Sequence, residues 1–178
     1  MSTIRRINLW GGPCSGKSKT AALLFNRLSL MGLSIENPRE YVKDEYVYRG
    51  LPSPKGFDQL DVFNGQCRAE RNMLKNVDYI ISDSPVAMTV RYAQESFEGW
   101  EYLLGLSRIY DAQYPPLNIL LDRTGIKYDT CGRYQTEEEA NLMHSKIVEF
   151  LESHGQQYVT MRTLDVADKV NEIAAMLC

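Results

Sequence analysis

The chain has 178 residues, of which 44% are hydrophobic and 24% charged, and its formal net charge is −3. This length suits one domain with a substantial core, and the slightly acidic balance argues against broad, sequence-blind binding to nucleic acid. The four cysteines are far apart and form no CxxC pair, which disfavours a zinc site and a secreted disulfide framework. No N-terminal stretch is apolar enough for a signal peptide or membrane span, so we expect a cytoplasmic protein (host cytoplasm if viral) with no membrane partner.

Short apolar runs alternate with longer amphipathic segments, a pattern typical of a parallel sheet covered by helices. In the first half of the chain, the pattern predicts a strand at 6–10, a helix from 17 to about 31, a strand at 33–37, a loop at 50–56, a helix at 58–75 and a strand at 77–82. In the second half it predicts a helix at 86–106 interrupted near 99, a strand at 117–121, an irregular polar segment at 122–135, a helix from 136 to about 154, a strand at 156–161 and a helix at 165–177. Thr136 and Glu139 predict a capping box. The expected fold class is therefore α/β, a three-layer fold with a five-stranded, mainly parallel sheet in one domain over 1–178.

The stretch NLWGGPCSGKSKT, residues 8–20, matches the pattern G-x-x-x-x-G-K-[ST] between a predicted strand and a predicted helix. We call residues 11–18 the P-loop. Its glycines let backbone N–H groups point inward around an anion, and the helix N-terminus adds partial positive charge there. Lys17 is expected to neutralise the β- and γ-phosphates of a nucleotide, and the Ser18 hydroxyl to bind Mg²⁺. The residues expected to hold ATP are Gly12, Pro13, Cys14, Ser15, Gly16, Lys17, Ser18, Lys19 and Arg123.

A P-loop occurs in GTPases, motor-type ATPases and small-molecule kinases. The sequence has no Asn-Lys-x-Asp guanine-reading motif, and 178 residues leave little room for the extra helical domain of a motor ATPase. A kinase must close a cationic cover over the transferred phosphoryl group and exclude water. The segment at about 123–135 contains Arg123, Lys127 and Arg133, which suits a short lid, although a solvated charged loop is the plain alternative.

Carboxylates follow two of the predicted strands, where open α/β sheets place ligand-binding groups. Asp83 can serve the Mg²⁺ shell, accept the proton of an attacking hydroxyl or simply cap the next helix. Glu36 and Glu40 follow the second strand, and of these Glu40 is the preferred group for orienting the acceptor.

Further candidates lie on the predicted helices. Gln66 can hydrogen-bond a base edge, and Arg71 and Arg91 can contact a substrate phosphate, although helix-surface residues of these types are more often solvated. Arg68 and Tyr92 are weaker candidates of the same kinds. No catalytic role is expected for His144 or His154, whose helix looks peripheral.

The stretches GGPCSGKS, ENPREYVK, VDYIISDSPVAMTVRYA and LLDRTGIKYDTCGRYQT together resemble a group of small P-loop kinases. That group includes nicotinamide-riboside-kinase-type domains and bacteriophage kinases, and the last stretch is most similar to phage enzymes that phosphorylate 5-hydroxymethyluracil in DNA. The resemblance covers about residues 4 to 162 and implies Mg-ATP as donor and modified DNA as a partner. It also implies that Arg133 contacts the transferring phosphoryl group and that Asp83 lies near the metal and acceptor.

The sequence thus predicts a kinase with Lys17, Asp83, Arg133 and Glu40 as its catalytic residues, and with Ser18 and Asp83 serving the metal. The preferred acceptor is the 5-hydroxymethyl group of 5-hydroxymethyluracil in phage DNA. Two alternatives stay open: a kinase for a free nucleoside or nucleoside monophosphate, and an ATPase or nucleotide-binding regulator without a small acceptor. The oligomeric state is not determined by the sequence.

Overall fold

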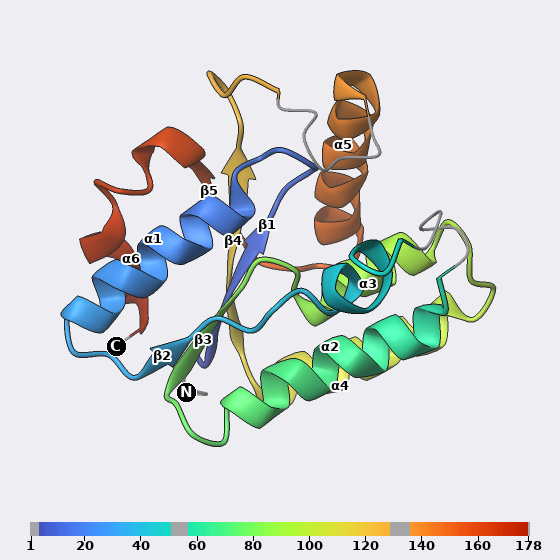
Figure 1. Cartoon of the computed structure of the whole chain (residues 1–178), viewed down its shortest axis with the longest axis horizontal. Helices are drawn as coiled ribbons and strands as arrows, with labels where there is room; N and C mark the ends of the chain where they lie inside the picture. The colour runs from blue at the N-terminus through green and yellow to red at the C-terminus, as the bar shows by residue number, and fades with distance from the viewer. Residues whose placement is uncertain (1–3, 51–56, 129–135, 178) are drawn as a thin grey trace.

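A five-stranded parallel sheet forms the centre of the molecule, with strands in the order β2-β3-β1-β4-β5 (Figure 1). The computed structural model describes residues 4–50, 57–128 and 136–177. The strands are β1 (Arg6–Trp10), β2 (Ile35–Glu36), β3 (Tyr79–Ser82), β4 (Pro116–Asp122) and β5 (Val159–Arg162). The expected α/β class and parallel sheet are confirmed.

The helices cover both faces of the sheet, which makes three layers (Figure 1). Their bounds are α1 (Lys17–Leu30), η1 (a π-helical turn, Lys43–Val47), α2 (Gln59–Met73), α3 (Val86–Ala93), α4 (Trp100–Gln113), α5 (Glu137–Ser153), η3 (a 3-10 turn, Thr163–Asp165) and α6 (Val170–Leu177). One buried cluster joins the sheet to α1 and α6, and a second joins the opposite face to α2, α3, α4 and α5. None of the described helices is long and apolar enough to cross a membrane.

The apolar residues at the centre of each predicted strand explain the sheet. Ile7, Leu9, Ile81, Ile119 and Leu121 are completely buried, as expected for parallel strands covered on both faces. Burial of such side chains contributes about 1.5–3 kcal/mol each relative to exposure. The sheet therefore holds the carboxyl ends of β1 and β3 side by side, and the site lies there.

Several predicted boundaries are wrong at their ends. The interruption expected near 99 separates α3 from α4, but α4 continues beyond 106 to Gln113 because Ser107 and Tyr110 pack inward. The last strand begins at Val159, and the final helix begins at Val170 because η3 and a turn precede it. The capping box is present, with Thr136 Oγ1 accepting from the Glu139 N–H and the Glu139 carboxylate accepting from the Thr136 N–H. Most of the expected loop at 50–56 lies outside the described residues.

Candidate active site

The P-loop wraps the ammonium group of its own lysine. Lys17 Nζ donates to the carbonyl oxygens of Gly11 at 2.7 Å and Gly12 at 3.0 Å. Gly16 is the N-cap of α1 in a left-handed conformation (φ 82°), which glycine adopts without a Cβ penalty. A Cβ there would also lie 2.6 Å from the Thr163 side chain. The first turn of α1 thus opens onto the loop, an arrangement suited to binding phosphate.

One P-loop amide already has a partner. The Gly12 N–H donates to His144 Nδ1 at 3.3 Å, and a Cβ on Gly12 would lie 2.6 Å from the Ala140 carbonyl oxygen. Helix α5 therefore packs directly against the loop, so the expectation that its helix is peripheral is wrong. Burial lowers the pKa of His144, and the nearby charges of Lys17 and Arg123 lower it further, against an opposing effect of Asp122. The neutral imidazole that accepts from Gly12 is thus favoured.

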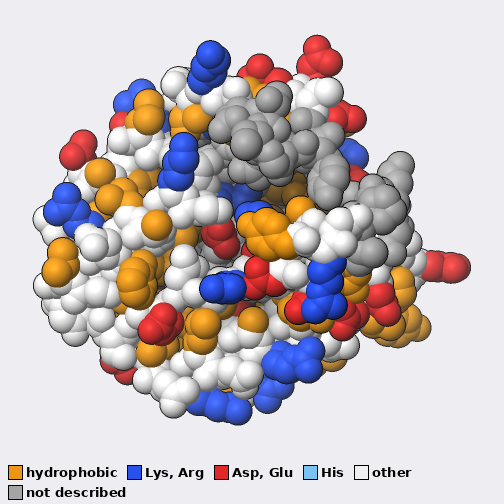
Figure 2. Space-filling view, in the orientation of Figure 1, with side chains coloured by type: hydrophobic (Ala, Val, Ile, Leu, Met, Phe, Trp, Pro, Cys, Tyr) orange, Lys and Arg blue, Asp and Glu red, His pale blue; other side chains and the backbone are white. Residues whose placement is uncertain are grey.

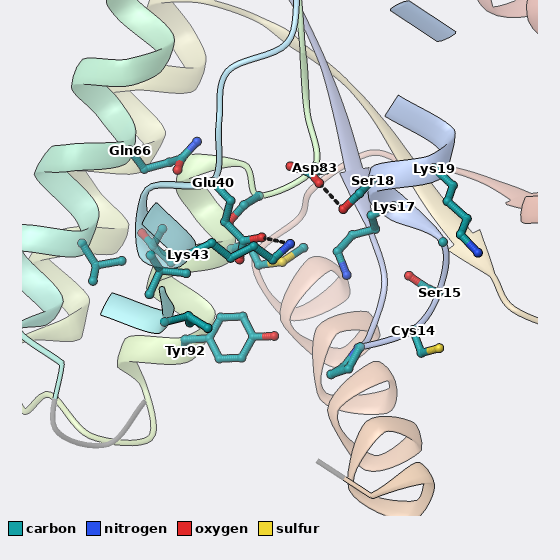
Figure 3. Close-up of a pocket in the computed structure, with 18 of the residues that line it drawn as sticks. Cys14, Ser15, Lys17, Ser18, Lys19, Glu40, Lys43, Gln66, Asp83 and Tyr92 are labelled. Atoms are coloured by element: carbon teal, nitrogen blue, oxygen red, sulfur yellow. Dashed lines mark hydrogen bonds and ion pairs between the residues drawn. The ribbon is translucent and has the colours of Figure 1, made fainter. Parts of the chain in front are cut away.

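Ser18 and Asp83 meet across the carboxyl end of the sheet. The Ser18 hydroxyl donates to Asp83 Oδ2 at 2.6 Å (Figure 3). One hydroxyl and one carboxylate are oxygen ligands that suit Mg²⁺, which keeps water and nucleotide phosphates as its other ligands. Among the described residues there is no group of three or more His, Cys, Asp or Glu side chains that could hold a metal ion. The pair fits the metal position of a P-loop site.

Glu40 lies opposite the P-loop in an ion pair with Lys43, whose Nζ is 2.6 Å from Glu40 Oε2 (Figure 3). Both side chains are partly buried, at 22% and 33% exposure, so the pair is better shielded than a surface salt bridge. Lys43 was not a predicted site residue, although it stands in the stretch ENPREYVK. Glu36 is exposed and does not line the cavity.

A cavity of about 510 Å³ connects these groups. Figure 2 shows acidic and basic side chains gathered around a hollow near the middle of this face. Predicted residues that line it are Pro13, Cys14, Ser15, Gly16, Lys17, Ser18, Lys19, Glu40, Gln66, Asp83, Tyr92 and Lys127. Gly12 is not among the lining residues, since its amide faces His144.

The two ends of the cavity differ in character. Beside the P-loop the wall includes Ile126, Thr163 and Leu164, and Thr163 Oγ1 donates to the Ser15 carbonyl oxygen at 2.8 Å. At the far end the wall combines apolar and aromatic side chains with a similar number of polar ones. The far-end residues, which we call the acceptor chamber after the role proposed for them below, are Val42, Val47, Phe57, Gln59, Val62, Gln66, Met88, Thr89, Tyr92, Glu95 and Ser96.

The structure does not bring the two candidate phosphate-binding arginines to the cavity. Arg71 is exposed in the last turn of α2, whereas the first turns of that helix line the cavity. Arg91 is buried between helices, where Nη2 pairs with Glu95 at 3.0 Å and Nε donates to the Lys146 carbonyl oxygen. An arginine on an amphipathic helix gives no sequence signal of which neighbour it will meet.

The start of the expected lid is tied to α5. Arg123 Nη2 lies 2.6 Å from Glu137 Oε1, and its guanidinium lies 5.5 Å from the Tyr128 ring centroid. Arg123 itself does not line the cavity, whereas Lys127 does. Arg133 lies outside the described residues, so its role stays a prediction.

Comparisons with known proteins agree with this architecture. The structure resembles that of NadR protein in complex with NR, with a TM-score of 0.73, 15% sequence identity and coverage of 98% of this chain and 51% of that one. It also resembles thymidylate kinase from Ehrlichia chaffeensis, with a TM-score of 0.63, 15% identity and coverage of 99% of this chain and 100% of that one. The chain thus spans about half the length of the NadR chain and all of the thymidylate kinase, and it shares their fold.

No curated protein matches the sequence significantly. A family model does match it, and this model describes an AAA domain. The match includes the P-loop, Asp83 and the helices that form the acceptor chamber. Because it extends over residues 6–169, which is most of the chain, the protein belongs to the AAA domain family.

Proposed function

We propose that this protein is a kinase that transfers the γ-phosphoryl group of ATP to a hydroxyl of a nucleoside or nucleotide. The observation that carries the proposal is the single cavity that joins the P-loop to the acceptor chamber, with Asp83 and Glu40 at their junction. An enzyme that only hydrolyses ATP needs a water site beside the γ-phosphate and no second chamber. A kinase needs both ends.

The donor binds at the P-loop. Backbone N–H groups at the start of α1 and the Lys17 ammonium would hold the phosphates, and the Ser18–Asp83 pair would hold Mg²⁺. When bound, Mg²⁺ supplies charge neutralisation to the β- and γ-phosphate oxygens. Ile126, Thr163 and Leu164 flank the P-loop and form the wall for the rest of the nucleotide.

The acceptor binds in the acceptor chamber. Asp83 is assigned to the metal together with Ser18, so Glu40 is the group proposed to orient the attacking hydroxyl and accept its proton. Lys43 holds that carboxylate in place through the ion pair. Because phosphoryl transfer depends mainly on positioning and charge stabilisation, these few groups suffice for the reaction.

The chamber suits a nucleobase. Phe57, Met88 and Tyr92 offer apolar and aromatic surface, while Gln59 offers an amide group. A volume of about 510 Å³ for the whole cavity lies in the usual range for small-molecule sites. The similarity in fold to a thymidylate kinase and to NadR bound to NR supports a nucleoside-type acceptor. The base 5-hydroxymethyluracil in DNA remains the acceptor that the resemblance to phage kinases implies, and it would have to be flipped out of the duplex to enter.

An acceptor screen tests the proposal. Purified protein is incubated with ATP labelled at the γ-phosphate, Mg²⁺ and, separately, free nucleosides, nucleoside monophosphates and DNA with or without 5-hydroxymethyluracil. We expect label in at least one of these acceptors. Label in mononucleotides but not in polymer assigns a free substrate, and label only in the hydroxymethyluracil-containing DNA assigns the modified base. Label released as inorganic phosphate alone, regardless of acceptor, contradicts the proposal and supports an ATPase.

A further inference from the structure

A carboxylate is completely buried behind the acceptor chamber. Glu70 of α2 has no exposed surface, and its two oxygens receive hydrogen bonds from four side chains. Ser82 Oγ donates to Oε1 at 2.8 Å and Gln66 Nε2 at 3.4 Å, while Tyr110 OH donates to Oε2 at 3.2 Å and Arg6 Nη1 at 3.3 Å. Burial and the nearby Glu70 charge raise the pKa of Tyr110, so this phenol remains a donor.

Filling a protein core with such a cluster of charged and polar groups is energetically unfavourable. Removing a carboxylate and a guanidinium from water costs several kcal/mol for each ion, and well-packed apolar side chains often serve stability as well. Arg6 is itself completely buried and pairs with both Glu70 and Asp111. Two of the hydrogen bonds to Glu70, from Ser82 and from Gln66, lead from this cluster toward the site.

One connection reaches Asp83. Ser82 is the last residue of β3 and directly precedes Asp83 in the chain. Its buried hydroxyl is held by Glu70 at 2.8 Å. The backbone that aims the Asp83 carboxylate at Ser18 is thus fixed one residue earlier.

The other connection reaches Glu40 through Gln66. Gln66 Nε2 donates to Glu70, and Gln66 Oε1 accepts from the backbone N–H of Tyr41 at 3.1 Å. A carboxylate only accepts and a backbone N–H only donates, so these two partners allow one orientation of the amide. Tyr41 directly follows Glu40 in the chain. The backbone beside the Glu40 carboxylate is therefore fixed by the hydrogen bond of the next residue. In this structure Gln66, expected to read a base, holds the wall of the chamber.

We propose that Glu70 is a positioning residue that holds both pocket carboxylates, Asp83 through Ser82 and Glu40 through Gln66 and the Tyr41 amide. The inference rests on the proposed function, because it assigns Glu70 an effect on phosphoryl transfer. Misplacement of a reacting group by about 1 Å can cost a hundredfold in rate, so a modest relaxation of either connection is measurable in turnover.

The first experiment measures positioning without any acceptor. Amide hydrogen exchange at Tyr41 is followed in the wild type, in Glu70→Gln and in Gln66→Met, which keeps a similar side-chain volume. Both variants are expected to raise the exchange rate of the Tyr41 amide at least tenfold. Ser107→Ala is the control, since Ser107 is equally buried but its hydroxyl donates to the Leu104 carbonyl oxygen within α4. An unchanged Tyr41 rate in Gln66→Met contradicts the second connection.

The second experiment measures turnover after loss of the hydrogen bond from Ser82 to Glu70. Because this change leaves Glu70 in place, the test can still be made if Glu70→Gln does not fold. Ser82→Ala is expected to lower kcat about tenfold with the KM for ATP within twofold, and Ser82→Thr, which retains the hydroxyl, is expected to recover most of the loss. A kcat for Ser82→Ala equal to that of Ser107→Ala overturns the proposal. A wild type that transfers label to no acceptor overturns the proposed function instead, while the exchange result at Tyr41 still stands.

Discussion

The Ser18 hydroxyl donates a 2.6 Å hydrogen bond to Asp83 Oδ2 and so joins the first turn of α1 to the end of β3. The two residues are 65 positions apart in sequence. They meet because β1 and β3 are parallel neighbours, with Asn8 of β1 opposite Ser82. A P-loop after one strand and a carboxylate after the next strand in the sheet therefore share one edge.

Replacing Asp83 with Asn keeps the shape of the side chain and removes its charge. We expect kcat to fall about a hundredfold or more, the range for loss of one electrostatic contribution at a reacting centre, and the Mg²⁺ concentration for half-maximal rate to rise. Steady-state rates over a Mg²⁺ titration measure both effects. Asp78→Asn is a matched control, because Asp78 is exposed and directly precedes the first residue of β3, whereas Asp83 directly follows the last. The N-cap of α3 is Pro85, without a side-chain hydrogen bond, so Asp83 does not cap that helix, and a rate unchanged from wild type would contradict a role for Asp83 in transfer.

Lys17→Ala removes the ammonium that the P-loop carbonyls surround. Transfer should fall by at least about a hundredfold, because no other loop side chain supplies charge to the phosphates at that position. Circular dichroism should show an intact fold. Lys75→Ala, at an exposed site outside the cavity, should keep wild-type turnover. Full activity of Lys17→Ala is the result that rejects the P-loop assignment.

Gly65 of α2 is needed for close packing of the segment that carries Glu40. A Cβ at this position would lie 2.4 Å from the Tyr41 ring, while one at Gly105 in α4 meets nothing within 4 Å. Gly65→Ala should therefore destabilise the fold by about 1–3 kcal/mol through overpacking and raise the KM for the acceptor. Gly105→Ala should instead stabilise it by about 0.5–1 kcal/mol through helix propensity. Urea unfolding measures the two free energies, and equal shifts for both variants would show that Tyr41 moves aside freely.

His144 gives stability a pH dependence near neutrality. Burial lowers its pKa in the folded state, so below about pH 6.5 the unfolded chain binds a proton that the folded chain does not. Stability should therefore fall as the pH drops through about 6.5 and show no His144 contribution above it. In His144→Asn, whose amide oxygen can still accept from Gly12, this component should disappear, while His154→Asn should retain it. Thermal unfolding between pH 5.5 and 7.5 makes the comparison, and an identical pH slope in His144→Asn and wild type would be inconsistent with a buried neutral His144.

The sequence predicted those features that depend on local pattern. The apolar runs located all five strands, and Thr136 with Glu139 located the start of α5, because alternation and capping are short-range properties. The P-loop and the strand-end carboxylates of Asp83 and Glu40 were also accessible, since parallel strands collect such groups at one edge. These residues stand together at the cavity.

Long-range side-chain partners were not accessible from the sequence. His144 meets Gly12 across 132 positions, and Arg6 meets Glu70 across 64. Such contacts depend on how helices pack on the sheet, which no local spacing encodes. The same reason explains why the sequence did not show that Arg71 and Arg91 lie outside the cavity lining, or that Gln66 contacts Glu70 and Tyr41.

Membership of the AAA domain family is compatible with ATP hydrolysis as well as with transfer. The two activities differ in where the γ-phosphoryl group goes, and the acceptor chamber is the structural reason to expect transfer. Met88 and Tyr92 belong to the acceptor chamber and not to the P-loop. Substitutions that enlarge or shorten these side chains should therefore change binding of the acceptor and not binding of ATP.

The most direct test of this account is the partition of label from γ-labelled ATP between an organic product and inorganic phosphate, with the best acceptor present at saturation. The account predicts that most of the label enters the acceptor, and that Met88→Trp, which fills the chamber, abolishes this while ATP still binds. Label that appears only as inorganic phosphate, at a rate indifferent to every acceptor and to the filled chamber, would contradict it.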